Sequence, residues 1–128
     1  MSTPFAEWLG MRFDTAEDGE REVVLRVLPE HCNKRGVVHG GVVSSLLDTA
    51  LGAAVIAAMK PEEWCGTVSL SVQFVRPARG ARVTARGWFE GRGERIAFAQ
   101  GVLKDASGKV CARAHGTWHI WPGHPDED

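Results

Sequence analysis

One acidic side chain interrupts the most apolar stretch of this 128-residue chain. Residues 42–59 read VVSSLLDTALGAAVIAAM, in which Asp48 is the only charged residue. An unpaired carboxylate is costly to bury, so Asp48 needs either a polar partner or a chemical role. Ser44 and Ser45, one helical turn earlier, could supply the partner. The apolar surroundings favour a functional role for Asp48 over a purely structural one.

Three residues just before this stretch, His39, Gly40 and Gly41, stand where a helix would begin. No Ser, Thr, Asp or Asn occupies the expected N-cap, so the first backbone N–H groups need an acceptor. Glycines there would let a ligand oxygen approach those donors closely. On spacing alone, tight packing or a turn explains the two glycines better, and His39 is interpreted as a structural donor at the helix entry.

Other polar residues give weaker signals on their own. Asn33 is explained by a turn and Thr67 by a strand, while the spacing of His115 and His119 does not suggest a metal. No metal site is therefore predicted. Any single arginine of the second half suits a solvated strand face, but several together could hold phosphate groups. These arginines are Arg76, Arg79, Arg82, Arg86, Arg92 and Arg95.

The elements that must position these residues follow from hydrophobic periodicity. Residues 42–59 are barely long enough to cross a membrane and contain polar side chains, so a buried helix of a soluble protein is predicted. Because the helix is apolar all round, it should be covered on most sides.

Strands are predicted before and after this helix in the sequence. Apolar and polar residues alternate over several segments, which indicates strands with one buried face, and Gly- and Pro-containing turns separate them. The expected strands are 22–29, 67–75, 81–90, 95–105 and 109–121. In 67–75, the expected apolar face comprises Val68, Leu70, Val72 and Phe74. The order predicts an α+β domain over residues 1–128, with an antiparallel sheet wrapped around one long helix.

Bulk properties narrow the class of protein further. The length fits one domain, and 15 basic against 16 acidic residues leave a net charge of −1. Neither nucleic acid nor an anionic membrane is therefore an expected partner. The widely spaced Cys32, Cys65 and Cys111 suggest reduced thiols. With no secretory signal at the start, we expect a cytoplasmic protein.

The chain resembles the hotdog-fold thioesterases of the phenylacetate-degradation (PaaI-like) type. The resemblance rests on NKRGVVHGGVVSSLLD (33–48), where Asn, His-Gly-Gly and Asp stand at fixed offsets, and on the less specific TVSLSVQFVRPA (67–78). It implies the hotdog fold, two chains joined edge to edge, and hydrolysis of acyl-coenzyme A (acyl-CoA) thioesters. No cofactor is implied, because coenzyme A is part of the substrate.

The resemblance also implies a role for each motif residue. Asp48 would be the general base or, alternatively, a nucleophile, and the Gly40 backbone N–H would be the oxyanion donor. Asn33 would lie beside the thioester carbonyl or the attacking water. Thr67 would help to place that water, and His39 belongs to the same motif.

Geometry indicates that two chains form each site. Gly40 and Asp48 are eight residues apart, which is about 12 Å of helix rise. One small thioester cannot contact both, but antiparallel helices of a two-fold dimer can bring them together. The assembly could be a dimer or a dimer of dimers. Candidates for binding the CoA phosphates are Arg76, Arg92 and Arg95.

Two other functions remain open at this point. A hotdog hydratase or dehydratase could use His39 with Asp48, although the Asp-to-His spacing of that motif is missing. A non-catalytic acyl-CoA sensor would tend to lack the carboxylate and to carry a DNA-binding segment. Within the thioesterase interpretation, the acyl group could be aryl, phenylacetyl-type or medium-chain.

Overall fold

The computed structural model describes residues 2–124 and contains one antiparallel sheet with a long helix against it. The strand order is β1-β2-β4-β5-β6-β3. This arrangement confirms the predicted α+β architecture. In chain order the elements are α1 (Pro4–Leu9), β1 (Met11–Thr15), β2 (Arg21–Arg26), the 3-10 turn η1 (Pro29–His31), α2 (Gly40–Ala57), β3 (Trp64–Phe74), β4 (Arg82–Arg92), β5 (Ile96–Asp105) and β6 (Val110–Trp121).

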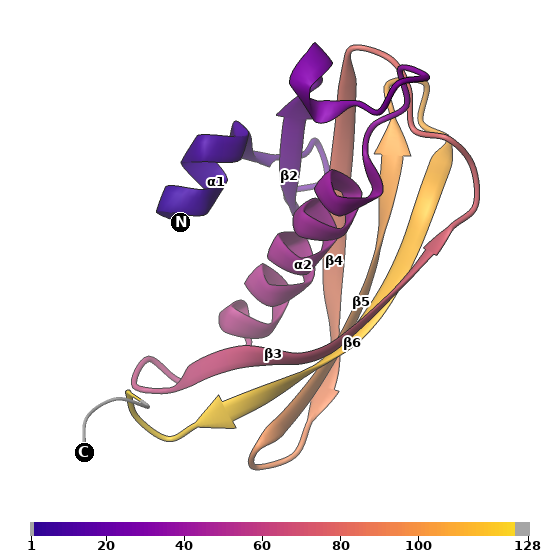
Figure 1. Ribbon diagram of the computed structural model, residues 1–128. Coiled ribbons are helices and arrows are strands. Elements are labelled where there is room, and N and C mark those ends of the chain that lie inside the picture. Colours follow the sequence, from indigo (N-terminus) through magenta and orange to yellow (C-terminus); the bar gives the residue numbers. More distant parts are fainter. Residues whose placement is uncertain (1, 125–128) are drawn as a thin grey trace.

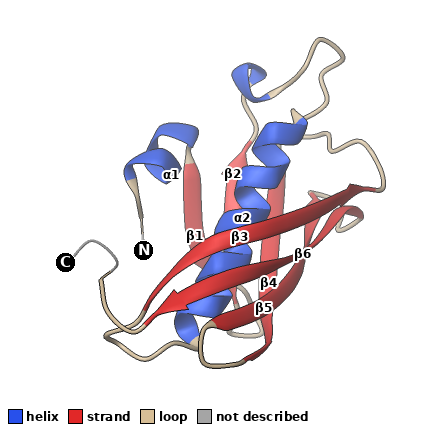
Figure 2. Ribbon diagram, turned by 60° about the horizontal axis from the view of Figure 1, so that its bottom comes forward, coloured by secondary structure: helices blue, strands red, loops and turns tan. Residues whose placement is uncertain are grey.

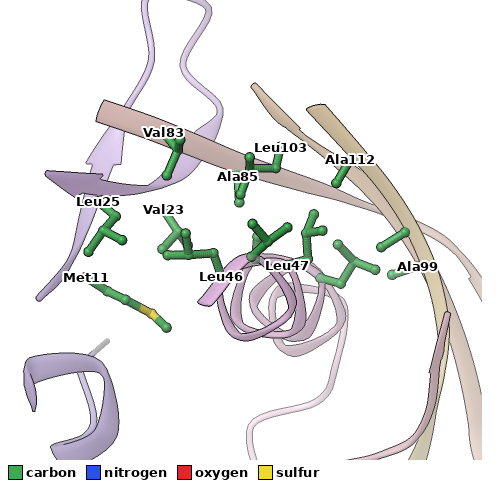
Figure 3. Packing of buried hydrophobic residues seen from close by; sticks show 14 of the residues in the cluster. Met11, Val23, Leu25, Leu46, Leu47, Val83, Ala85, Ala99, Leu103 and Ala112 are labelled. Atoms are coloured by element: carbon green, nitrogen blue, oxygen red, sulfur yellow. The ribbon is translucent and has the colours of Figure 1, made fainter. Parts of the chain in front are cut away.

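The sheet curls around α2, which lies along its concave side (Figures 1 and 2). The helix buries a leucine-rich stripe against the sheet, and Leu46, Leu47 and Leu51 are fully buried. Figure 3 shows Leu46 and Leu47 beside inward-facing residues of the sheet, among them Val23 and Ala85. Burial of these aliphatic side chains fixes the helix relative to the strands.

Two paired glycines let α2 approach the sheet closely. Gly87 of β4 lies opposite Gly101 of β5. A Cβ on Gly87 would lie 2.7 Å from the Ala50 carbonyl oxygen, and one on Gly101 would lie 2.5 Å from the Leu51 Cδ1. No side chain fits in this space, so both positions require glycine.

The sequence pattern misses two elements near the N-terminus. α1 is a short helix, capped by the Thr3 hydroxyl, which accepts from the Ala6 N–H, and ended by Gly10 in the left-handed conformation. β1 follows it and pairs with β2, which makes β1 an edge strand. Only Met11 of β1 is buried, so this strand carries no clear alternation.

The predicted face of Val68 is wrong. The pairing of β3 with β6 shifts between Thr67 and Ser69, so Val68 bulges out of the ladder and is 63% exposed. A bulge changes which face the preceding residue occupies. Thr67 consequently lies opposite Trp118 of β6 and points toward α2.

The expectation that α2 is covered on most sides holds only for its inner side. By length and composition alone, α2 could cross a membrane, but here it packs against the sheet. Its other side is open in the single chain, where Gly41 and Ile56 are exposed.

Candidate active site

The N-terminus of α2 is capped by a histidine. The His39 Nδ1 accepts a hydrogen bond from the Gly41 N–H at 2.8 Å. His39 was expected to be a structural donor at this point; here its side chain is instead the acceptor of the capping hydrogen bond. Because Nδ1 accepts, the proton of the neutral ring lies on Nε2.

The cap leaves the Gly40 N–H available. No acceptor for it occurs among residues 2–124, and Gly40 lines a cavity of about 400 Å³ together with Asn33, Phe74 and Arg76. The Phe74 ring would lie 3.4 Å from a Cβ on Gly40. A helix N-terminus with a free N–H facing a cavity can polarise a ligand oxygen.

Asn33 organises the loop that leads into α2. Its Oδ1 accepts from the Arg35 N–H at 2.9 Å and from the Val37 N–H at 3.2 Å. This is the turn role that the sequence allowed. The side-chain amide donates no hydrogen bond to residues 2–124, so its N–H groups can still bind a ligand in the same cavity as Gly40.

Asp48 has a polar partner on the sheet. The Thr67 hydroxyl donates to Asp48 Oδ1 at 2.8 Å. The Ser45 hydroxyl donates instead to the Gly41 carbonyl oxygen at 2.8 Å. Thr67, which precedes the bulge at Val68, is therefore the hydrogen-bond partner of Asp48, and Ser45 is not.

A second cavity, of about 780 Å³, opens beside Asp48 and Thr67. It extends along α2 past Gly52 and Ala53 and is lined on the sheet side by Trp118, among others. Its size suits an organic ligand of moderate length. Cys65 also lines it; burial, and secondly the Asp48 charge, raise the pKa of this thiol.

A single chain does not bring the predicted site residues together. Asp48 and Thr67 line the 780 Å³ cavity, whereas Gly40 and Asn33 line the 400 Å³ cavity at the other end of α2. The chain therefore presents two candidate half-sites, one with a carboxylate and one with a backbone donor.

The predicted phosphate-binding arginines fall in different places. Arg92 donates to both Glu63 carboxylate oxygens, at 2.7 and 2.9 Å. The hydrogen bond from Arg92 lowers the pKa of Glu63 to about 2. Arg92 and Arg95 line a third cavity, of about 470 Å³. Arg76 lines the 400 Å³ cavity instead, with its Nε donating to the Val110 carbonyl oxygen at 3.0 Å.

Sequence reasoning missed two residues that shape these cavities. Phe74 was expected on a buried strand face, yet it is 57% exposed in the chain and covers Gly40. Trp118 fitted the alternation of its strand, but nothing in the pattern indicated that it lines the Asp48 cavity. Over residues 2–124, no three His, Cys, Asp or Glu side chains gather as a metal site.

Comparison with known proteins identifies the class. Residues 35–112 match the sequence model of the thioesterase superfamily. The chain therefore belongs to the thioesterase superfamily, and it is a thioester hydrolase with the hotdog fold, as predicted.

Individual relatives span nearly the whole chain. A protein of Pseudomonas aeruginosa provisionally described as an esterase is 34% identical, covering 93% of this chain and 90% of its own. The medium/long-chain acyl-CoA thioesterase YigI of Escherichia coli is 26% identical, with coverage of 91% and 85%.

Solved structures give the same result. A Bacillus halodurans protein crystallised with CoA has a TM-score of 0.89 at 26% identity, covering 96% of this chain and 82% of its own. A mutant of the phenylacetic acid degradation protein PaaI from Thermus thermophilus has a TM-score of 0.79 at 27% identity, with coverage of 91% and 98%. The predicted PaaI-like resemblance is confirmed.

Proposed function

We propose that this protein hydrolyses acyl-CoA thioesters at sites shared between two chains, with Asp48 as general base. The observation that carries the proposal is the Asp48 carboxylate, which Thr67 holds in the wall of a 780 Å³ cavity. The CoA in the Bacillus halodurans structure and the name of the Escherichia coli relative support the substrate class.

The edge strand β3 supports an assembly of two chains. It ends the sheet, and its exposed apolar residues Trp64, Val68 and Phe74 are between 47% and 63% exposed. Such an edge is usually paired or protected. If two β3 strands pair antiparallel about an axis near residues 70–71, Thr67 of one chain lies opposite Phe74 of the other.

This pairing would join the two half-sites. The cavity with Asp48 and Thr67 would face the cavity with Gly40 and Phe74 of the second chain, because those cavities flank opposite ends of β3. An isologous dimer would then contain two complete sites. A dimer of dimers would contain four.

The chemistry follows from the charges at the two half-sites. Asp48 takes a proton from water, and the water oxygen attacks the thioester carbonyl carbon. The Gly40 N–H of the other chain stabilises the oxyanion, and collapse of the intermediate breaks the C–S bond. The CoA thiolate leaves with its electron pair and then gains a proton. Thr67 orients the carboxylate, and the Asn33 amide N–H can donate to the carbonyl oxygen or to the water.

We favour Arg76, which lines the Gly40 cavity, as a phosphate ligand over Arg92, because Arg92 would first have to leave Glu63. Arg95 remains the other candidate, because its side chain donates no hydrogen bond within residues 2–124.

Asp48→Asn tests the proposal. Thiol release from benzoyl-, phenylacetyl- and medium-chain acyl-CoA should fall about 10²–10⁴-fold, with an unchanged circular dichroism spectrum. Ser44→Ala, one turn away on the same helix, is the control and should keep near wild-type turnover. Near wild-type turnover of Asp48→Asn on the best substrate would show that Asp48 is structural.

A further inference from the structure

The indole of Trp118 lies beside the proposed catalytic carboxylate. Trp118 projects inward from β6, directly opposite Thr67 on β3, and Thr67 holds Asp48. Its Nε1 lies 3.6 Å from the point where a Cβ on Gly52 would be. Gly52 is one helical turn beyond Asp48, and all four residues line the 780 Å³ cavity.

The Trp118 N–H has no hydrogen-bond partner within residues 2–124, although its side chain is almost wholly buried. The residue is only 1% exposed, and its Nε1 donates no hydrogen bond to any residue between 2 and 124. Within residues 2–124, every side-chain nitrogen or oxygen that is fully shielded from solvent has a hydrogen-bond partner. Because Nε1 has no partner, it cannot be fully shielded. The small exposed fraction of Trp118 therefore includes Nε1, which opens to the cavity.

An unpaired donor on a cavity wall discriminates between ligands. An acyl chain that fills the cavity displaces water from the N–H. A hydrocarbon then leaves the donor unsatisfied, whereas an oxygen acceptor replaces the lost hydrogen bond. Sites with a polar group of this kind reject analogues that lack the matching atom.

We propose that the Trp118 N–H selects acyl-CoAs whose acyl group carries an acceptor oxygen about one helical turn from the thioester carbonyl. The four residues from Asp48 to Gly52 correspond to about 6 Å of helix rise. A ketone, hydroxyl or ether oxygen on the fifth carbon of an extended acyl chain reaches about that far. This inference rests on the proposed function, since it places the thioester beside Asp48.

Two substrates of nearly equal shape test the inference. 5-Oxohexanoyl-CoA has an acceptor oxygen on its fifth carbon, and 5-methylhexanoyl-CoA has a methyl group in its place. The quantity measured is the ratio of kcat/KM for these two thioesters. It is compared among the wild type, Trp118→Phe and the control Trp121→Phe, whose indole lies on the outer face against His119.

The wild type and Trp121→Phe should prefer the oxo substrate about tenfold, and Trp118→Phe should bring the ratio near one. A ratio that is unchanged by Trp118→Phe would overturn the inference while leaving the proposed function intact. If the wild type hydrolyses neither of these two substrates nor hexanoyl-CoA faster than Asp48→Asn does, the proposed function is overturned, and this inference with it.

A binding measurement covers the case in which Trp118→Phe fails to fold. In ¹⁵N-labelled Asp48→Asn, the indole N–H signal of Trp118 is assigned by elimination, using single Phe substitutions of the other tryptophans. It should move downfield with 5-oxohexanoyl-CoA and not with 5-methylhexanoyl-CoA. Equal shifts with both, or none, would overturn the inference. The other tryptophans are Trp8, Trp64, Trp88 and Trp121.

Discussion

The carboxylate of Asp48 is tolerated in an apolar helix for two reasons. Thr67 donates a hydrogen bond to one oxygen, and a cavity that water can enter lies beside it. Both options that the sequence left open therefore hold together: Asp48 has a polar partner and occupies a position suited to chemistry. Desolvation of the charge is limited because the site is open.

The charge of Asp48 acts on one neighbouring thiol. The pKa of Cys65 is raised mainly by burial and secondly by the negative charge of Asp48. Asp48→Asn removes this charge and should therefore lower the pKa of Cys65. A larger thiolate fraction reacts faster. Alkylation of Cys65 by iodoacetamide at pH 8, followed by mass spectrometry, should be a few-fold faster than in wild type.

Cys32, which lies in the loop before α2 and pairs with Val38, is the internal control for this experiment. Its alkylation rate should be the same in both proteins. An unchanged or slower rate at Cys65 would contradict the electrostatic contact between the two side chains.

The sequence could supply the candidate residues of the site, but not their contacts. Asp48, Gly40 and Asn33 stand in one recognisable motif. The hydrogen bond between Thr67 and Asp48 depends on the bulge at Val68, and a simple two-residue period gives no sign of a bulge. The capping role of His39 was also hidden, because imidazole rarely replaces the usual N-cap side chains.

At the scale of elements, the contact between α2 and the sheet depends on glycine. Gly101→Ala should destabilise the protein by about 1–3 kcal/mol or more, because its Cβ would meet Leu51 and the Arg86 carbonyl oxygen. Gly93→Ala, where a Cβ meets nothing within 4 Å, should be nearly neutral. Urea unfolding measures the free energy of unfolding of both variants. Equal stability of the two would show that α2 can shift away from the sheet.

The ion pair between Arg92 and Glu63 ties the β4–β5 turn to the loop before β3. Glu63 has an ordinary pKa of 4.5 and a folded value of about 2. A lowered carboxyl pKa stabilises the fold above pH 4.5, and this contribution disappears as the pH falls to 2. Glu63→Gln should therefore lower Tm at pH 7 and have little effect near pH 2.

Glu62→Gln is the matched control, since Glu62 forms no ion pair within residues 2–124. Thermal unfolding followed by circular dichroism from pH 2 to 7 makes the comparison. If the decrease in Tm caused by Glu63→Gln stays constant from pH 2 to 7, the ion pair is excluded as its cause.

The sequence predicted the long helix and the strands after it more successfully than the N-terminal elements. α2 and β3–β6 have sustained periodicity and clear turns between them. α1 has only six residues, and β1 contributes little buried surface, so their stability comes mostly from tertiary contacts. The open outer side of α2 was likewise not predictable from an apolar sequence alone.

At the scale of the whole molecule, the central claim is that one chain holds only half-sites. Gly40 and Asp48 lie in separate cavities, and β3 offers an edge by which two chains can combine them. Helix rise alone predicted this separation from the sequence, and the structure places the two residues in different cavities.

Complementation between one variant in each half-site tests this claim most directly. Asn33→Asp keeps the Oδ acceptor of the loop but replaces the amide donor by a charge, and Asp48→Asn removes the base. The two variants are unfolded and refolded together in equal amounts, and thiol release is compared with each variant alone. A mixed dimer has one doubly altered site and one intact site, and random pairing makes half the dimers mixed. We predict recovery of about a quarter of wild-type activity. Activity that stays at the average of the two variants would show that each site belongs to a single chain.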